Sequence, residues 1–456
     1  MRKMLIPLCC GLLLLFCACQ HTPSTASSVD AAIPSAEPSN SETSALTSYP
    51  TAEEVQTLTI ARVENNRYIS EAIEAFNNLD TAQQLESVWY AGNEGELKLS
   101  LISGDGPDLI SLDGFEYETY AAKGVFVNLY DYLNNDPDIT PDQLVQPALK
   151  AMEWSDHALY QISPTYYLQS MYVSHEVWDS TSPWDLDHIE AWMDTHPDSA
   201  FTNAVETPAE LLTVLLRGYL PSFIDYTQMT CDFTSDRFIR LLEDASSWSQ
   251  RDWKDAITEQ NAFQNGSILC GWNQLSSFDG YKELSDQGLT NSVGFPSDGD
   301  PCVFVGSVIR FGICGGTGRE SAAWEFIKTT LSADYQKIVP WLPLLKSELS
   351  VRAQEAEKEI PPTVTDAFAN PADAAAGTNM GTVSVTLPPV KGLTEEEIRD
   401  MEAVLDQAST FSGNTNVEIW VIIYDEVDAY FSGQKTAEEV AEIIQNRVSI
   451  YLAERD

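Results

Sequence analysis

The feature that most constrains the fold is an early alternation of strand and helix patterns. Apolar residues at 58–61 predict a short strand, and residues 69–76 carry apolar side chains at the i, i+3, i+4, i+7 spacing of one helix face. A second strand is predicted over 85–90, a second helix over 96–102 and a third strand over 108–112. Because the links are short, right-handed crossovers are expected, and the alternation predicts an α/β fold with a parallel sheet.

Length and charge narrow the class of protein. The chain has 456 residues, enough for two or three lobes that each bury a core. Its 69 acidic residues outnumber its 25 basic residues, which gives a formal net charge of -44. A surface this negative repels phosphate backbones and anionic headgroups, so no nucleic-acid partner is expected. The charge favours a soluble monomer, although acidity can also reflect only the source organism.

The first residues have the pattern of an export signal. A short basic start precedes an apolar stretch from Leu5 to Ala18, which is shorter than the ~20 residues of a bilayer span, so residues 1–19 are predicted to be a secretory signal peptide. The segment Leu15 to Cys19 resembles the bacterial lipobox, which implies that Cys19 is lipidated and becomes the mature N-terminus. The alternative is ordinary signal cleavage beside a chance cysteine. Residues 20–50, rich in Ser, Thr, Pro and Ala, predict a flexible linker.

The sequence lacks motifs for metal, nucleotide or nucleophilic chemistry. The histidines form no H-E-x-x-H cluster, no G-x-S-x-G occurs, and the glycine-rich segment 312–318 has no phosphate-binding lysine. Beyond the signal, the cysteines are widely spaced, at Cys231, Cys270, Cys302 and Cys314. This spacing argues against a zinc site and leaves one disulfide or buried thiols as alternatives. No metal, cofactor or enzymatic activity is therefore expected.

Eight short motifs follow one another between residues 103 and 454. They are Ser103–Ile110, Gly124–Leu129, Leu159–Val173, Ser182–Leu186, Ala262–Trp272, Val293–Pro296, Glu320–Gln336 and Ile444–Glu454. In content and order they resemble the extracellular solute-binding proteins of bacterial ABC importers, of the maltose-binding-protein type (family 1). Each motif alone is weak, and their shared order carries the resemblance.

The resemblance implies a two-lobed α/β fold of the periplasmic-binding-protein-like type II class, with hinge strands and an interlobe cleft. One lobe is expected at residues 55–163 plus 296–340, and the other at residues 164–295 plus 341–456, since the chain crosses the hinge more than once. The implied function is that of a substrate-binding lipoprotein. It captures a small solute, a carbohydrate by preference, through hinge closure and delivers it to the membrane permease of an ABC transporter.

The resemblance and the signal together imply a location. The mature protein is expected on the extracellular face of the cell membrane, held there by the lipid on Cys19. The long linker and the acidity favour a Gram-positive surface over a periplasm.

Candidate ligand residues come from a general rule for open α/β sheets. Ligands bind beyond the carboxyl ends of the strands, where loops and helix N-termini converge. The rule nominates Arg62, Glu64, Asp113, Tyr166, Tyr167, Trp272, Asn273, Gly306, Ser307 and Trp341. Aromatic faces stack on the C–H face of a sugar and carboxylates and amides bind its hydroxyls, so this set suits a carbohydrate. Gly306 would let backbone approach a ligand, and neighbouring Tyr166 and Tyr167 cannot both face a cleft from one strand.

Five further tryptophans are expected to pack in the core or between helices. They are Trp89, Trp154, Trp248, Trp324 and Trp420.

Two rival interpretations remain open from the sequence. A surface-anchored glycoside hydrolase would need two carboxylates ~5 to 10 Å apart, and chance acidic pairs abound in this chain. Alternatively, a binding protein of this type could take a non-sugar solute such as a peptide or a polyol. The net charge disfavours strongly anionic ligands, unless basic residues such as Arg62 or Arg310 override it locally.

Overall fold

The structure is a computed structural model of the chain. It describes residues 56–79, 83–115, 117–179, 181–225, 228–251, 254–259, 261–359, 363–368, 382–387, 391–412 and 417–454. The predicted signal peptide at 1–19, the lipidation site Cys19 and the linker at 20–50 lie outside the described residues. In the part of the chain that is described, no helix is both long and apolar enough to cross a membrane.

A four-stranded sheet contains the first three strands of the chain. Its members are β1 (Gln56–Arg62), β2 (Gln83–Trp89), β3 (Leu109–Ser111) and β11 (Phe311–Ile313). Their order is β11-β3-β1-β2, with β2 and β3 parallel to β1 and the late strand β11 antiparallel to β3. Helices α1 (Arg67–Asn77) and α2 (Glu94–Ser103) make the two crossovers. The predicted strand-helix alternation is therefore confirmed.

A seven-stranded sheet forms the second half of the fold. Its strands are β4 (Thr165–Val173), β5 (Ala200–Thr202), β8 (Ile268–Leu275), β9 (Asn291–Ser292), β10 (Val303–Gly306), β12 (Leu342–Pro343) and β15 (Ala408–Phe411). The main path is β15-β10-β4-β8-β5, and β9 and β12 also pair with β4. The long central strand β4 is antiparallel to both of its main-path neighbours, β8 and β10.

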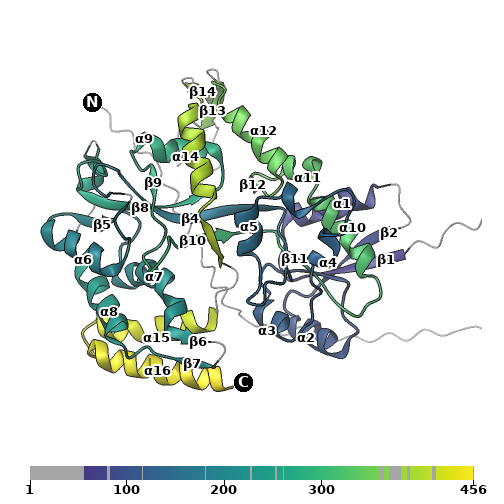
Figure 1. Ribbon diagram of the computed structural model, residues 1–456, viewed down its shortest axis with the longest axis horizontal. Coiled ribbons are helices and arrows are strands. Elements are labelled where there is room, and N and C mark those ends of the chain that lie inside the picture. The colour runs from purple at the N-terminus through teal and green to yellow at the C-terminus, as the bar shows by residue number, and fades with distance from the viewer. Residues whose placement is uncertain are drawn as a thin grey trace, which may run out of the picture. The chain divides into compact units, whose positions relative to one another are not determined.

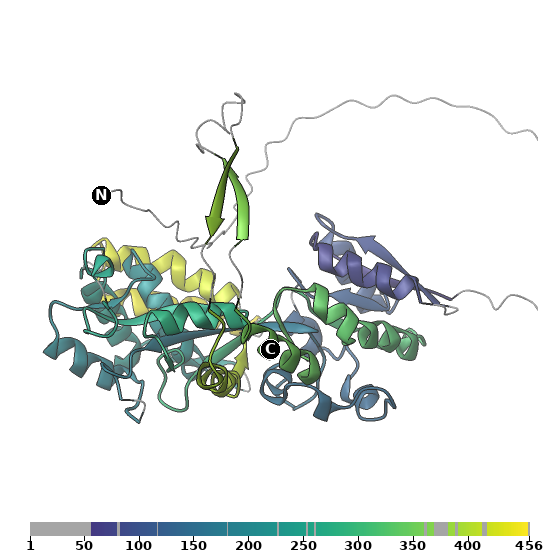
Figure 2. The ribbon, with the colours of Figure 1, turned by 90° about the horizontal axis from the view of Figure 1, so that it is seen from above.

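Helices gather around each sheet, as Figure 1 shows. Beside the four-stranded sheet lie, in addition to α1 and α2, the helices α3 (Tyr117–Ala122), α4 (Tyr130–Leu133), α10 (Glu320–Thr330) and α11 (Ala333–Ile338). The other helices are α5 (Gln146–Ala151), α6 (Leu186–Thr195), α7 (Pro208–Tyr219), α8 (Asp236–Trp248), α9 (Phe278–Asp286), α12 (Lys346–Ala356), α14 (Glu395–Leu405), α15 (Val417–Phe431) and α16 (Ala437–Ala453). In Figure 2 the yellow C-terminal helices lie at the opposite end of the ribbon from the purple first strands and helix.

Short elements complete the fold. They are the 3-10 turns η1 (Pro141–Gln143), η2 (Leu220–Phe223) and η3 (Ala256–Thr258), and the strand pairs β6 (Ile224–Asp225) with β7 (Thr230–Cys231) and β13 (Thr363–Phe368) with β14 (Thr382–Leu387).

The chain passes from one sheet to the other between β10 and β11. β10 pairs with β4 in the seven-stranded sheet, whereas β11 pairs with β3 in the four-stranded sheet. The first lobe was expected to resume at residue 296, but the strands place this return after Gly306. At the crossing, the hydroxyl oxygens of Ser163 and Ser307 lie 2.6 Å apart, so two linking segments are tied side by side.

One apolar core spans both sheets. It contains Leu58 and Ile60 from β1 together with Tyr166, Leu168 and Tyr172 from β4. A second core lies only on the other face of the seven-stranded sheet, and a third lies only with the four-stranded sheet. The side-chain alternation of β4 thus divides its residues between two cores.

Helix α7 carries residues of the candidate site, and its start is specified locally. Thr207 accepts the backbone N–H of Glu210, while the Glu210 carboxylate accepts the backbone N–H of Thr207. Pro208 follows at the first helical position, where its missing N–H costs nothing. This capping box fixes where α7 begins and therefore which of its residues face the sheet.

Candidate functional site

Asp113 lies just beyond β3, at the carboxyl end of a strand of the four-stranded sheet. Its side chain is 14% exposed, and its Oδ2 atom is buried without a hydrogen-bond partner in the described part of the chain. Burial raises the pKa of this carboxyl to about 6; the Arg310 guanidinium and the Asn66 side chain oppose the rise, and the Glu64 carboxylate adds to it. Asp113 therefore presents an unused acceptor that is ionised above about pH 6.

Arg310 precedes β11 and is held by three groups. Its Nη1 donates to Oε1 of Gln161 at 3.1 Å, and its Nη2 donates to the carbonyl oxygen of Leu112 at 2.9 Å. Its Nε lies 3.7 Å from Oδ1 of Asp113. The guanidinium also stands over the ring of Phe411, 5.6 Å from the centroid. These contacts fix a positive charge beside Asp113 and use most of its donors.

Glu64 lies exposed on the loop after β1, and its carboxylate is near Asp113. Its side chain covers Gly114, whose φ is +69°. A Cβ at Gly114 would lie 2.9 Å from Oε1 of Glu64, so a larger residue would displace the carboxylate as well as strain the backbone. Glu64 and Asp113 are thereby brought together, as the sequence analysis nominated.

Tyr167 faces Gly306 across the β4–β10 pair. The two residues are direct cross-strand partners, and a Cβ at Gly306 would lie 2.1 Å from the Tyr167 ring. The space above Gly306, which was expected to admit a ligand, is therefore filled by an aromatic ring. Tyr167 itself is half-buried, and burial raises its pKa while Arg217 and Arg310 oppose that rise.

Arg217, on α7, is a residue that the sequence analysis missed. Its guanidinium lies 5.0 Å from the ring centroids of both Phe295 and Phe304. Gly218 permits this approach, because a Cβ there would lie 2.2 Å from the carbonyl oxygen of Pro296. The available signal was a single arginine within the apolar run of α7.

We call Glu64, Asp113, Tyr167, Arg217 and Arg310 the junction cluster. Its members come from the loops of the four-stranded sheet, from β4 and from α7. The charges of Asp113, Arg217 and Arg310 all act on Tyr167, so the phenol lies within electrostatic reach of one acidic and two basic groups.

Aromatic side chains of α15 lie close to this cluster. Tyr424 is 42% exposed and acts electrostatically on Arg217, and its hydroxyl contacts that of Thr213 on α7. Trp420, expected in the core, is only half-buried and lies 6.0 Å from Tyr424 between ring centroids. Their spacing of four residues on one helix was the sequence signal for a shared aromatic face.

Two nominated residues lie inside the protein. Tyr166 is fully buried in the core that spans both sheets, because alternation along β4 turns it away from Tyr167. Arg62 is 3% exposed, donates to Ser70 and to the Asn66 carbonyl, and stands 4.6 Å from the Trp89 ring centroid. Trp89 was expected in the core but is 49% exposed beneath this guanidinium.

The remaining nominees occupy other places. Trp272 is partly buried against the second core, on the same face of β8 as its partner Met171. Asn273 points to the opposite face of the sheet, since side chains alternate along a strand. Ser307 ties the crossing segments, and Trp341 packs edge-on against Tyr68, 5.2 Å between centroids. The structure therefore does not bring these residues to the junction cluster.

A hollow adjoins the cluster through Phe411. Its volume is about 590 Å³, within the usual range for small-molecule sites. It is lined by Lys150, Ala151, Glu153, Trp154, His157, Ser409, Thr410 and Phe411. Helix α5 and strand β15, which contact each other, both border the hollow.

The thiols give no sign of catalytic activation. All four described cysteines are free, and burial raises the pKa of each, that of Cys314 to about 12. Thiols of this kind stay protonated near neutral pH and are poor nucleophiles. Within the described residues, no group of three His, Cys, Asp or Glu side chains could hold a metal ion.

A protein-family model matches most of the chain. Residues 71–372, well over half of the chain, match the family model of bacterial extracellular solute-binding proteins. A search of curated proteins found no match. Among solved structures, the sugar-binding protein MalE from Xanthomonas citri is similar, with 13% identity, a TM-score of 0.53 and coverage of 88% of this chain and 98% of that one.

Two further structures share the fold. A periplasmic oligogalacturonide-binding protein from Yersinia enterocolitica has 13% identity and a TM-score of 0.52, with coverage of 88% and 99%. A de novo designed cysteine esterase has 14% identity and a TM-score of 0.54, with the same coverage. The pair illustrates that a fold alone does not define an activity. The family match does define the class: this chain belongs to the bacterial extracellular solute-binding proteins.

Proposed function

We propose that the protein captures a carbohydrate at the junction cluster and delivers it to the membrane permease of an ABC importer. The observation that carries this proposal is the buried Oδ2 of Asp113, which lacks a partner beside a fixed arginine. Buried polar atoms are almost always hydrogen-bonded, so an orphan acceptor in a solute-binding protein points to a ligand donor. A sugar hydroxyl supplies such a donor.

Aromatic groups near the cluster support a sugar over other solutes. Tyr167 lies within electrostatic reach of Asp113 and Arg217, and the exposed Tyr424 lies beside Trp420. Rings of this kind stack on the apolar face of a pyranose while carboxylates orient its hydroxyls. The MalE protein and the oligogalacturonide-binding protein, which share the fold, take saccharides according to their names.

Capture would proceed by closure of two lobes about the crossing segments. In this proposal one lobe holds residues 55–163 and a return segment that begins after Gly306, and the other holds β4 through β10 and the C-terminal helices. The ligand favours the closed form by the contacts it gains there from both lobes. No covalent step is required, and glycoside hydrolysis is the alternative outcome that the experiment must detect.

We further propose how the protein is attached to the membrane and in which oligomeric state it acts. Cys19 would carry the lipid, the linker at 20–50 would hold the folded part above a Gram-positive membrane, and the protein would act as a monomer. Incorporation of labelled palmitate into the wild type but not into Cys19→Ala would support the anchor. Release of the wild type into the medium without label would overturn it.

The binding test uses the mature protein, a thermal-shift screen of mono- and oligosaccharides, and calorimetry on each hit. We expect saturable binding, with the sugar recovered unchanged. Asp113→Asn should weaken affinity about 10- to 100-fold, since a hydrogen bond to a charged group is lost. The affinity of the wild type should decrease when the pH is lowered below about 6, because Asp113 is then protonated.

The matched control is Asp105→Asn, which alters an exposed carboxylate in the turn before β3. It should leave affinity unchanged. Cleavage of the sugar, or equal loss in both variants, would contradict the proposal.

A further inference from the structure

We propose that the ligand of the junction cluster carries an oxyanion group, which Arg217 binds through its guanidinium. The inference rests on the proposed function, because it names the chemistry of a substituent on the same ligand. It follows from the position of one arginine that has no charged partner in the described chain.

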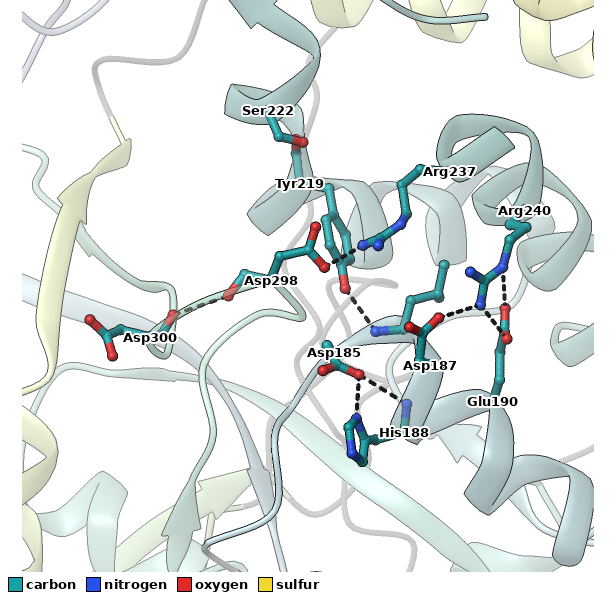
Figure 3. Close-up of polar contacts among 12 residues, drawn as sticks. Asp185, Asp187, His188, Glu190, Tyr219, Ser222, Arg237, Arg240, Asp298 and Asp300 are labelled. Atoms are coloured by element: carbon teal, nitrogen blue, oxygen red, sulfur yellow. Dashed lines mark hydrogen bonds and ion pairs between the residues drawn. The ribbon is translucent and has the colours of Figure 1, made fainter. Parts of the chain in front are cut away.

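The other buried or half-buried arginines donate within the chain: Arg62 donates to Ser70 and to the Asn66 carbonyl oxygen, although its Nε has no partner. Arg310 has Gln161, Leu112 and Asp113, and Arg352 donates to the carbonyls of Trp341, Gln336 and Val339. Figure 3 shows the same for two arginines of α8, with Arg237 directed at Asp298 and Arg240 at Asp187 and Glu190. Donation to at least one acceptor of the described chain is therefore the rule for these guanidinium groups.

Arg217 departs from that rule. It makes no hydrogen bond or ion pair with any other described residue, although Phe295 and Phe304 flank it. Its titratable neighbours are Tyr167, Cys302 and Tyr424, none of which is a carboxyl group, and burial lowers its pKa. The aromatic faces compensate only in part, because cation–π contacts contribute about 0.5 to 2 kcal/mol and accept no N–H donor.

An oxyanion fits the vacant donors of this guanidinium. Carboxylate, sulfate and phosphate groups each offer two oxygens to the planar fork of an arginine, whereas a single hydroxyl offers one. Arg217 is half-buried rather than sealed, and the exposed Tyr424 stands near it, so a ligand group can reach the fork.

The position of Arg217 is set by the backbone. Gly218 lets α7 approach Pro296 closely, and that approach places the guanidinium of the preceding residue over the rings of Phe295 and Phe304. The two rings contact each other edge-on, 5.4 Å between centroids, and the guanidinium lies against both of them. The guanidinium is thereby preorganised, which reduces the entropic cost of binding an anion.

The charge of the whole protein limits the ligand further. A net charge of -44 repels polyanions, and only one guanidinium in the cluster is unpaired. A saccharide with a single oxyanion satisfies both conditions. Uronates, sugar sulfates and sugar phosphates share this chemistry and are separated by the experiment.

The experiment compares matched saccharides that differ only at C6: hydroxyl, carboxylate, sulfate or phosphate. Calorimetry on the wild type should show at least one oxyanion form binding about 30-fold or more tightly than the hydroxyl form, and Arg217→Gln should remove that preference. Arg217→Lys should recover only part of it, because the fork is lost. The control Arg240→Gln, which changes a paired surface arginine, should keep the full preference.

The outcomes separate this inference from the proposed function. Equal affinity for hydroxyl and oxyanion forms would overturn the inference and leave sugar binding intact. Binding of no saccharide would overturn both. Loss of the preference in the wild type at high salt and in Arg217→Gln at low salt would support the inference, since both weaken an ionic contact.

A second measurement, of thermal stability, distinguishes a binding role of Arg217 from a structural one. Without ligand, Arg217→Met should unfold at the same temperature as the wild type or higher, because removing an unpaired buried charge relieves a desolvation cost. A large drop in Tm for Arg217→Met, with the oxyanion preference absent in the wild type, would identify Arg217 as a packing residue and overturn the inference.

Discussion

Arg310 and Arg217 act on the same phenol, that of Tyr167, but they differ in how they are satisfied. Arg310 is enclosed by an amide, a carbonyl and a carboxylate from its own half of the fold. Arg217 lies against two aromatic rings and has no carboxylate partner among the described residues. The difference teaches that buried charge alone does not mark a binding group. A charge without a partner does mark one, because nothing in the folded protein compensates for the desolvation of that charge.

The comparison predicts its largest effect for Arg310. Arg310→Met should lower the free energy of unfolding by about 3 to 5 kcal/mol, because it leaves the Asp113 carboxylate buried without its partner. Urea denaturation at pH 7 measures the change. The same substitution at Arg217 should have no such cost, and equal losses at both positions would break the comparison.

The next effect is the pH dependence of stability that Asp113 imposes. The folded protein holds this proton up to about pH 6, whereas the unfolded chain releases it near 3.8. Between these values the folded state binds more protons, so the free energy of unfolding should fall as the pH rises, by at most about 3 kcal/mol. Urea titrations at pH 4.5 and 7.5 measure it.

The variant Asp113→Asn isolates that effect. Its stability relative to the wild type should increase between pH 4.5 and pH 7.5, because the amide does not titrate. Asp105→Asn, on the exposed turn, should show no change in relative stability. An Asp113→Asn curve parallel to that of the wild type would refute the raised pKa.

A smaller effect is expected at the glycine that positions Arg217. Gly218→Ala should cost about 1 to 3 kcal/mol, since its Cβ would overlap the Pro296 carbonyl and push α7 away. The unfolding temperature and the affinity for the oxyanion saccharide should both decrease. In Gly280→Ala, on α9, the new Cβ would meet only side-chain atoms at 3.6 Å or more, so this control should be neutral or stabilising.

Local sequence patterns predicted much of the fold. The apolar periodicities before residue 112 predicted the parallel β-α-β-α-β unit, because each element there depends on its own residues and short links. The return point was expected at residue 296, whereas β10 pairs with β4 in the seven-stranded sheet, a contact between segments far apart in sequence. Nothing local to Val303–Gly306 specifies that partner.

The candidate site was less accessible to sequence reasoning. Glu64, Asp113 and Tyr167 were nominated because they follow or lie on predicted strands, and the structure brings them together. Arg217 was missed because its surroundings, and not its own sequence position, make it a candidate. Those surroundings form only when Gly218, Phe295 and Phe304 come together in space. Trp420 was assigned to packing because an amphipathic pattern does not show where a helix surface stays uncovered.

The most direct test is calorimetric titration of the mature wild-type protein and of Asp113→Asn with saccharides that stabilise it, followed by chromatography of the recovered ligand. The account predicts saturable binding by the wild type, affinity about 10- to 100-fold lower for Asp113→Asn, and a ligand recovered intact. Wild-type affinity that survives the substitution unchanged, or a ligand recovered as cleaved products, would contradict it.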